Sequence, residues 1–313
     1  TEGAGGSKMS DIKEVKKQSA GGSFYEVVRR DKKLEFCFYH PEGLGKEHIE
    51  YDDFHPLGVQ GDTQLVEYPL RNASKYWAVC TEPRPPDSDL DEQILNYLTR
   101  YYELPDESMY YNHVGWVKSS WIPEMYHVAP YLFFHGQPDT GKTQAQETLR
   151  QLVFRGILSA DMSEAMIFRL IDKHRPTVFI DEAESLNTKE RAKSLNLLNS
   201  GYKRGYTVWR ASTRPEDDFE PTSYDLFGFK CLASTERLSR TTESRCLPTV
   251  MEIASREIES PPDPIAARDI RNQLLWMRWR ILYEAFKPPN DLYSSYTLDT
   301  FDTPKRGKMP EMK

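Results

Sequence analysis

The feature that most restricts the fold is a short apolar segment followed at once by a glycine-containing loop. Residues 131–134 are Tyr-Leu-Phe-Phe, a composition typical of a buried strand. The next residues match the pattern G-x-x-x-x-G-K-T and are Gly136, Gln137, Pro138, Asp139, Thr140, Gly141, Lys142 and Thr143. Glycine lets such a loop turn tightly, so that backbone N–H groups and the start of the next helix point at one anion. The pattern predicts a phosphate-binding loop between a strand and a helix.

Two side chains of this loop, and two carboxylates further along, have specific expected roles at a nucleoside triphosphate. Lys142 would reach the β- and γ-phosphates, and Thr143 would supply a hydroxyl to Mg²⁺. Residues 177–180 are Thr-Val-Phe-Ile, a second buried strand, and Asp181 and Glu182 follow it. Asp181 can hold Mg²⁺ through its water shell, and Glu182 can accept a proton from an attacking water or polarise it. The second carboxylate favours hydrolysis, and the predicted cofactors are ATP and Mg²⁺.

Strands and helices alternate along the chain after residue 131. Helices are expected at 141–154, 161–173 and 189–200, and further strands at 156–160, 229–233 and 247–253. Such alternation predicts the α/β class, with a five-stranded, mostly parallel sheet flanked by helices, as in P-loop NTPases. A proline-rich break at 261–264 precedes a long helix expected at 265–286.

The chain before residue 131 has a different character. Strand-like segments at 24–28, 34–39 and 75–80 predict a small β-rich module. A proline-rich stretch at 82–87 then forms a stiff linker. Apolar residues at helical spacing predict a helix from residue 90, with Asp87 or Ser88 as its cap, and a second helix at 109–120.

Composition excludes several classes of function. The net charge of −7 gives no global signature of a nucleic-acid-binding protein, so any such contact must be a local patch. The four cysteines form no C-x-x-C pair, which argues against a zinc site or a disulfide framework. Neither a membrane-spanning run nor a signal peptide is recognisable, so we expect a cytoplasmic protein with no membrane contact.

The two strand-associated motifs resemble the Walker A and Walker B motifs of the AAA+ ATPases. The resemblance covers roughly residues 125–255 and implies further site residues. Thr235, with Ser234 before it, follows the fourth strand, where AAA+ proteins place a polar sensor. Residues 244–246 are Ser-Arg-Cys and look like the clamp-loader segment whose arginine reaches a neighbour's nucleotide. By that resemblance Arg245 is the arginine finger, with Arg240 and Arg237 as competitors and a plain surface arginine as the alternative.

The resemblance also implies a region after the core and an assembly. AAA+ proteins have a helical lid there, and a second-sensor arginine would come from its single visible helix, with Arg268 and Arg271 as candidates. The resulting division has six parts: a flexible arm (1–23), a β-rich module (24–82), a linker with helices (83–130), the ATPase core (131–255), a reduced lid (256–287) and a disordered tail (288–313). The implied assembly is a homo-oligomeric ring such as a hexamer.

The module also looks like helicase-like ATPases of plasmid, phage and integrated-element replication proteins. Hexameric AAA+ helicases can carry a DNA-contacting hairpin between the Walker B and sensor strands, and residues 201–210 predict a hairpin there. Lys203 and Arg204 would meet phosphates of single-stranded DNA, and Tyr202 or Tyr206 could stack on bases. The alternatives are a solvated hairpin or one packed on a neighbouring subunit.

The leading interpretation is a Mg²⁺-dependent AAA+-like ATPase that acts on DNA as a replicative helicase of a mobile element. One rival is an ATP-dependent loader or switch that assembles a protein–DNA complex without translocation. Another is an ordinary P-loop kinase, against which Glu182 and Arg245 both count. The sequence does not separate the motor from the switch.

Overall fold

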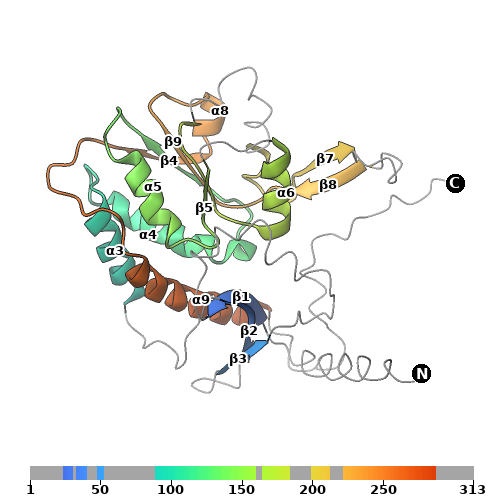
Figure 1. Ribbon diagram of the computed structural model, residues 1–313. Coiled ribbons are helices and arrows are strands. Elements are labelled where there is room, and N and C mark those ends of the chain that lie inside the picture. Colours follow the sequence, from blue (N-terminus) through green and yellow to red (C-terminus); the bar gives the residue numbers. More distant parts are fainter. Residues whose placement is uncertain are drawn as a thin grey trace, which may run out of the picture. The chain divides into compact units, whose positions relative to one another are not determined.

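The computed structural model describes residues 24–30, 33–40, 48–52, 89–159, 164–183, 199–211 and 221–286 (Figure 1). The chain divides into two compact units. One comprises residues 1–88 and 271–302, and the other comprises residues 89–270 and 303–313. Residues 264–270 of helix α9 (Pro264–Phe286) therefore belong to the second of these units, and residues 271–286 belong to the first.

The first unit contains a three-stranded antiparallel sheet in the order β1-β2-β3. Its strands are β1 (Phe24–Arg30), β2 (Lys33–His40) and β3 (His48–Asp52). The first two confirm predicted strands, whereas β3 was not predicted. Buried Tyr39 stacks on Trp279 of α9 with ring centroids 5.5 Å apart, and it meets Trp276 edge to face at 5.7 Å. An aromatic cluster thus holds this sheet to the second part of α9.

The second unit is built on a five-stranded sheet in the order β10-β4-β9-β6-β5. Every neighbouring pair is parallel, which confirms the predicted α/β class. The strands are β4 (Tyr131–His135), β5 (Ile157–Ser159), β6 (Val178–Ile180), β9 (Lys230–Ser234) and β10 (Cys246–Val250). Because the order departs from the sequence order, β9 separates the strand before the glycine-rich loop from the strand before Asp181.

Both faces of this sheet are buried, which explains the continuous apolar runs in its central strands. On one face Tyr131 and Phe133 of β4, together with apolar residues of the adjacent strands, pack with Phe168 and Ile171 of α6 (Glu164–His174). On the other face the ring of Phe179 meets Trp116 of α4 (Met109–Ser120) edge to face, at 6.2 Å. Helix α5 (Lys142–Arg150) packs on β9 and β5. The sheet is therefore the middle layer between helices.

The helix before the core is capped one or two residues later than predicted. Helix α3 (Leu90–Tyr101) begins after Asp89, whose Oδ1 accepts from the backbone N–H groups of Asp91 and Glu92 at 3.1 and 3.2 Å. The prediction of Asp87 or Ser88 as the cap is wrong, because a cap must lie beside the first orphan N–H groups.

A two-stranded antiparallel hairpin extends from the core next to α6 (Figure 1). It pairs β7 (Thr207–Ala211) with β8 (Pro221–Asp225). The short elements η3 (Pro123–Met125) and α8 (Arg240–Glu243) complete the unit. The arm at 1–23, the strand at 75–80, most of the helix at 189–200 and the tail at 288–313 lie outside the described residues.

Candidate functional site

The glycine-rich loop joins the end of β4 to the start of α5 at the carboxyl edge of the sheet. Asp139 and Gly141 both adopt left-handed backbone conformations, with φ of 62° and 82°. A Cβ atom added to Gly136 would lie 2.4 Å from the backbone oxygen of Met251, the residue after β10. The loop therefore needs glycine at position 136 because a neighbouring backbone lies against it.

Lys142 is the first residue of α5, and its side chain folds back into the loop. Its Nζ donates to the carbonyl oxygens of Gly136 and Gln137 at 2.8 and 2.6 Å. The side chain is buried, with 9% of the residue's surface exposed. The loop thus holds an ammonium group among its own carbonyls, beside the N–H groups of the helix start, as an anion site requires.

The residue after Lys142 reaches across the sheet to the second motif. The Oγ1 atom of Thr143 donates to Oδ2 of Asp181 at 2.8 Å, although the two residues are 38 positions apart. The strand order brings them together, because β4, β9 and β6 are adjacent and end at the same edge. A hydroxyl and a carboxylate at this spacing fit Mg²⁺, which takes few protein oxygens and keeps several waters.

Glu182 is exposed and lies next to this pair. Its φ is 51°, and its backbone N–H donates to Oδ1 of Asp181 at 3.0 Å. A left-handed conformation at a non-glycine residue costs free energy, and such strain gathers at functional sites. The turn after β6 therefore presents two carboxylates, one facing Thr143 and the other facing solvent.

The predicted sensor position lies beside the loop. Ser234 ends β9, is buried, and pairs in register with His135 at the end of β4. Its backbone oxygen accepts from the N–H of Gly136 at 3.4 Å, and Thr235 is the next residue. The sensor role of Thr235 stays a prediction, whereas its position beside the loop is a property of the fold.

A buried glutamine near the site was not predicted. Gln146 of α5 is fully buried, and its Nε2 donates to the backbone oxygen of Ile180 at 3.0 Å. This bond ties the helix after the loop to the strand before Asp181. The signal in the sequence was a polar residue on the apolar face of α5, where Ala145 and Leu149 are also buried.

Arg245 lies at the opposite edge of the sheet. It precedes β10, and its backbone oxygen accepts from the N–H of Tyr131, the first residue of β4, at 3.0 Å. A five-residue parallel strand spans about 16 Å, so Arg245 cannot reach its own glycine-rich loop. Of its competitors, Arg237 is paired with Glu243 at 2.9 Å, and Arg240 begins α8.

The segment that was expected to form a basic hairpin is instead a turn followed by β7. The prediction of a hairpin at 201–210 is wrong, because β7 pairs with β8, which follows in the chain after residues 212–220. Arg204 donates to the carbonyl oxygens of Pro123 and Tyr126 at 2.8 and 3.1 Å, and burial lowers the pKa of its guanidinium. Lys203 is exposed and Tyr202 is half-buried.

The two second-sensor candidates lie on α9 in different surroundings. Arg268 contacts the carboxylate of its neighbour Asp269 at 3.0 Å, and Arg271 is buried. Their predicted role stays a prediction. Among the described helices, α9 included, none has the length and apolar character needed to cross a membrane.

Comparison with known proteins gives matches to solved structures alone. No protein-family model and no curated protein matches the chain. The apo NrS-1 C-terminal region is 15% identical, with 83% of this chain and 68% of that chain covered and a TM-score of 0.39. JCV helicase is 15% identical, with 64% and 56% covered and a TM-score of 0.30. C. elegans PCH-2 is 14% identical, with 80% and 68% covered and a TM-score of 0.31. The chain thus spans little more than half of the helicase chain from JCV.

Proposed function

We propose that this chain is a Mg²⁺-dependent ATPase of AAA+ type. The observation that supports this most is the hydrogen bond of 2.8 Å between Thr143 and Asp181. It joins the end of a phosphate-binding loop to the carboxylate that follows a neighbouring parallel strand. Phosphoryl transfer needs little more from a protein than such positioning and charge.

The chain's own residues have distinct tasks in this proposal. Lys142 exchanges the carbonyl oxygens of Gly136 and Gln137 for oxygens of the β- and γ-phosphates, while loop N–H groups hold the same phosphates. Mg²⁺, held by Thr143 and Asp181, would neutralise charge on those oxygens. Glu182 takes the proton of the attacking water, and its exposed side chain leaves room for that water.

The proposed assembly is a ring of identical copies, with the hexamer as the form that the resemblance to AAA+ helicases implies. Arg245 supports it, because the sheet separates this arginine from the chain's own loop. It would act on the nucleotide of a neighbouring copy, where an arginine stabilises charge on the γ-phosphate.

The finer part of the proposal is a motor that acts on single-stranded DNA in the replication of a mobile element. The second candidate is a loader that assembles a protein–DNA complex without translocation. The two differ in what stimulates hydrolysis, since translocation consumes ATP continuously on DNA.

The test is ATP turnover by the purified chain, with and without Mg²⁺ and with and without single-stranded DNA. Turnover that requires Mg²⁺ and rises on DNA supports the motor, and stimulation by a protein partner alone supports the loader. Glu182→Gln should keep ATP affinity and lose hydrolysis, because the amide has the same size and cannot take the proton. Equal loss of affinity and turnover would make Glu182 structural. Light scattering with a non-hydrolysable ATP analogue reports the assembly.

A further inference from the structure

A buried hydrogen-bond network joins the two helices before the core to the edge strand β10. His113 of α4 is fully buried, and each of its ring nitrogens lies against a hydroxyl. Its Nδ1 is 2.8 Å from the hydroxyl of Tyr102, the C-cap of α3, and its Nε2 is 2.9 Å from Oγ1 of Thr249 in β10. Tyr102 and Thr249 are each 1% exposed. The imidazole therefore connects the helical segment directly to the strand.

The network is suited to an uncharged imidazole. Burial lowers the pKa of His113 to about 3, so the ring is neutral near pH 7. A neutral imidazole has one donor nitrogen and one acceptor nitrogen, and a hydroxyl can take either part. Both tautomers therefore satisfy both hydrogen bonds, and the network places no charge in the core.

The same histidine also contacts the strand that leads into the glycine-rich loop. Its ring meets Phe134 of β4 edge to face, with centroids 5.4 Å apart. Phe134 and Thr249 are partners in the parallel pairing of β4 with β10. His113 thus contacts both members of one cross-strand pair, two residues before Gly136.

Met251 connects this pair of strands to the loop itself. Its backbone N–H donates to the backbone oxygen of His135 at 2.7 Å, and its own backbone oxygen lies where a side chain at position 136 would be. Met251 is two residues after Thr249, so a displacement of β10 would also displace the backbone against which Gly136 packs. Because backbone N–H groups of such a loop hold phosphates, its shape affects phosphate binding.

The chain after Met251 is attached to the same helical segment. A guanidinium nitrogen of Arg256 donates to the backbone oxygen of Tyr102 at 3.2 Å, and its Nε lies 3.4 Å from the carboxylate of Glu103. The backbone N–H and the hydroxyl of Ser255 donate to the same carboxylate at 3.0 and 2.7 Å. The chain is therefore anchored to the end of α3 on both sides of Met251.

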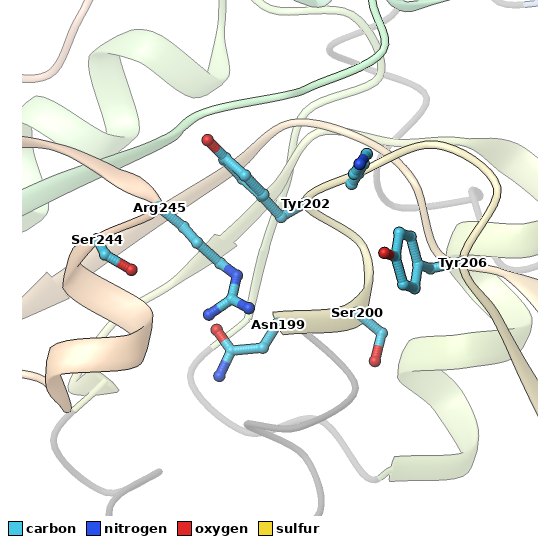
Figure 2. Close-up of a pocket in the computed structure, with 7 residues that line it drawn as sticks. Asn199, Ser200, Tyr202, Tyr206, Ser244 and Arg245 are labelled. Carbon is cyan, nitrogen blue, oxygen red and sulfur yellow. The ribbon is translucent and has the colours of Figure 1, made fainter.

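The two ends of β10 have different surroundings. Arg245, directly before the strand, lies in a pocket of about 470 Å³ that Tyr202 and Lys203 also line (Figure 2). Its guanidinium carbon is 5.8 Å from the centroid of the Tyr202 ring. Thr249 is outside the described lining of this pocket and lies about 13 Å further along the strand. A change at Thr249 therefore tests the loop end of β10 and leaves the pocket intact.

We propose that His113 is a positioning residue for nucleotide binding, because through Thr249 it holds β10 and Met251 where they support the phosphate-binding form of the glycine-rich loop. The inference rests on the proposed ATPase function and adds to it a residue that does not touch the nucleotide. The alternative is a histidine that only stabilises the core. A displaced loop binds ATP more weakly and raises KM, whereas a destabilised fold loses active molecules and lowers the apparent kcat with KM unchanged.

The first test is Thr249→Val, since valine has nearly the shape of threonine and lacks the hydroxyl. KM for ATP and the Kd of a non-hydrolysable ATP analogue should both rise about three- to tenfold, the effect of about one lost hydrogen bond, with kcat within about twofold of the wild type. Thr249→Ser keeps the hydroxyl and should restore both constants to within about twofold of the wild type. Unchanged KM and Kd in Thr249→Val would overturn the positioning role.

Ser120→Ala is the matched control for the loss of a buried hydroxyl. Ser120 of α4 is 2% exposed, and its Oγ donates to the backbone oxygen of Val117 at 2.6 Å and accepts from the N–H of Phe154 at 3.3 Å. Phe154 precedes β5, at the edge of the sheet opposite the glycine-rich loop. Urea unfolding midpoints should fall in both variants, whereas KM should rise in Thr249→Val alone. An equal rise of KM in both would assign the effect to general destabilisation and overturn the inference.

A double-mutant cycle shows whether His113 acts through Thr249. His113→Phe keeps an aromatic ring against Phe134 and cannot bond to either hydroxyl, so it should raise KM at least as much as Thr249→Val. The double variant should raise KM no further than His113→Phe alone, because both changes remove the same hydrogen bond. Fully additive effects would mean that the two residues act independently and would overturn the proposed connection. If His113→Phe does not fold, the comparison of Thr249→Val with Thr249→Ser decides the outcome.

Two results distinguish failure of this inference from failure of the ATPase itself. If Thr249→Val binds and hydrolyses ATP as the wild type does, His113 is a core residue alone and the ATPase stands. If Lys142→Ala hydrolyses ATP normally, the ATPase proposal fails, and the role of His113 fails with it.

Discussion

The two edges of the central sheet differ in how their polar residues are assembled. At the carboxyl edge, Asp181 directly follows buried strand β6, and Lys142 and Thr143 begin the helix after the loop that follows buried strand β4. At the amino edge, the pocket around Arg245 combines turns that lie far apart in the sequence and lead into β7 and β10. The difference teaches that a site built from single strand ends can be recognised in a linear motif, whereas a site built between turns requires the strand order.

The strongest test of this contrast is Lys142→Ala. We expect loss of measurable ATP binding or turnover, because the variant lacks the one charge directed at the β- and γ-phosphates. ATP affinity and turnover are measured separately, with Lys118→Ala as a control for removal of a lysine. Thermal unfolding checks that the loop variant is folded. Near-normal hydrolysis would show that the carboxyl edge is not the catalytic edge.

The next effect concerns Arg245 and probes the amino edge. Arg245→Ala should still bind ATP and hydrolyse it about 10³- to 10⁵-fold more slowly, the range reported for arginines that serve a γ-phosphate. Mixing with Glu182→Gln subunits should restore part of the activity, since each variant supplies what the other lacks. If Arg245→Ala is fully active and Arg240→Ala or Arg237→Ala is not, one of those two is the finger.

Two glycines allow a matched comparison of the edges. A Cβ at Gly136 would lie 2.4 Å from the Met251 oxygen, and a Cβ at Gly201 would lie 2.0 Å from the Leu226 oxygen. Either change to alanine should destabilise the fold by about 1–3 kcal/mol through overpacking. Gly136→Ala should also weaken ATP binding about tenfold or more, because the loop backbone must shift.

Gly201→Ala should instead leave ATP affinity unchanged and lower turnover, since it disturbs the turn that contains Tyr202 and Lys203. Urea unfolding, ATP affinity and turnover are compared for the two variants. An equal loss of ATP affinity in both variants would mean that the two edges do not have separate roles in ATP binding and turnover.

The division between the two edges also separates what the sequence predicts correctly from what it does not. The loop, Asp181 and the parallel sheet were predictable because apolar runs of strand length end at these residues. The hairpin at 201–210 was predicted wrongly because the glycines at 201 and 205 suggest a tight turn between strands. Neither the backbone carbonyls that hold Arg204 nor the partner strand β8 leaves a local signal in that segment. Long-range hydrogen bonds, such as that of Gln146 to Ile180, are equally invisible in a sequence pattern.

The last prediction concerns a lysine buried beneath the amino edge. Lys230 is 1% exposed, and its Nζ donates to the backbone oxygens of Leu226 and Gly228 at 3.1 and 3.0 Å. Burial lowers the pKa of Lys230 from 10.5 to about 7, with Asp225 opposing the shift. In the unfolded chain the lysine keeps its proton up to its ordinary pKa.

Between pH 7 and about 10 the folded protein therefore binds fewer protons than the unfolded chain at this position, so raising the pH should stabilise the fold. We expect the free energy of unfolding of the wild type, relative to Lys230→Met, to rise by up to about 1.4 kcal/mol per pH unit in this range. Urea unfolding at pH 7, 8 and 9 measures the difference, with Lys118→Met as the exposed-lysine control. A difference that does not change with pH would mean that Lys230 remains charged among its carbonyl partners. The amino edge would then rest on a buried cation, and its contrast with the carboxyl edge, where Lys142 holds the charge, would weaken.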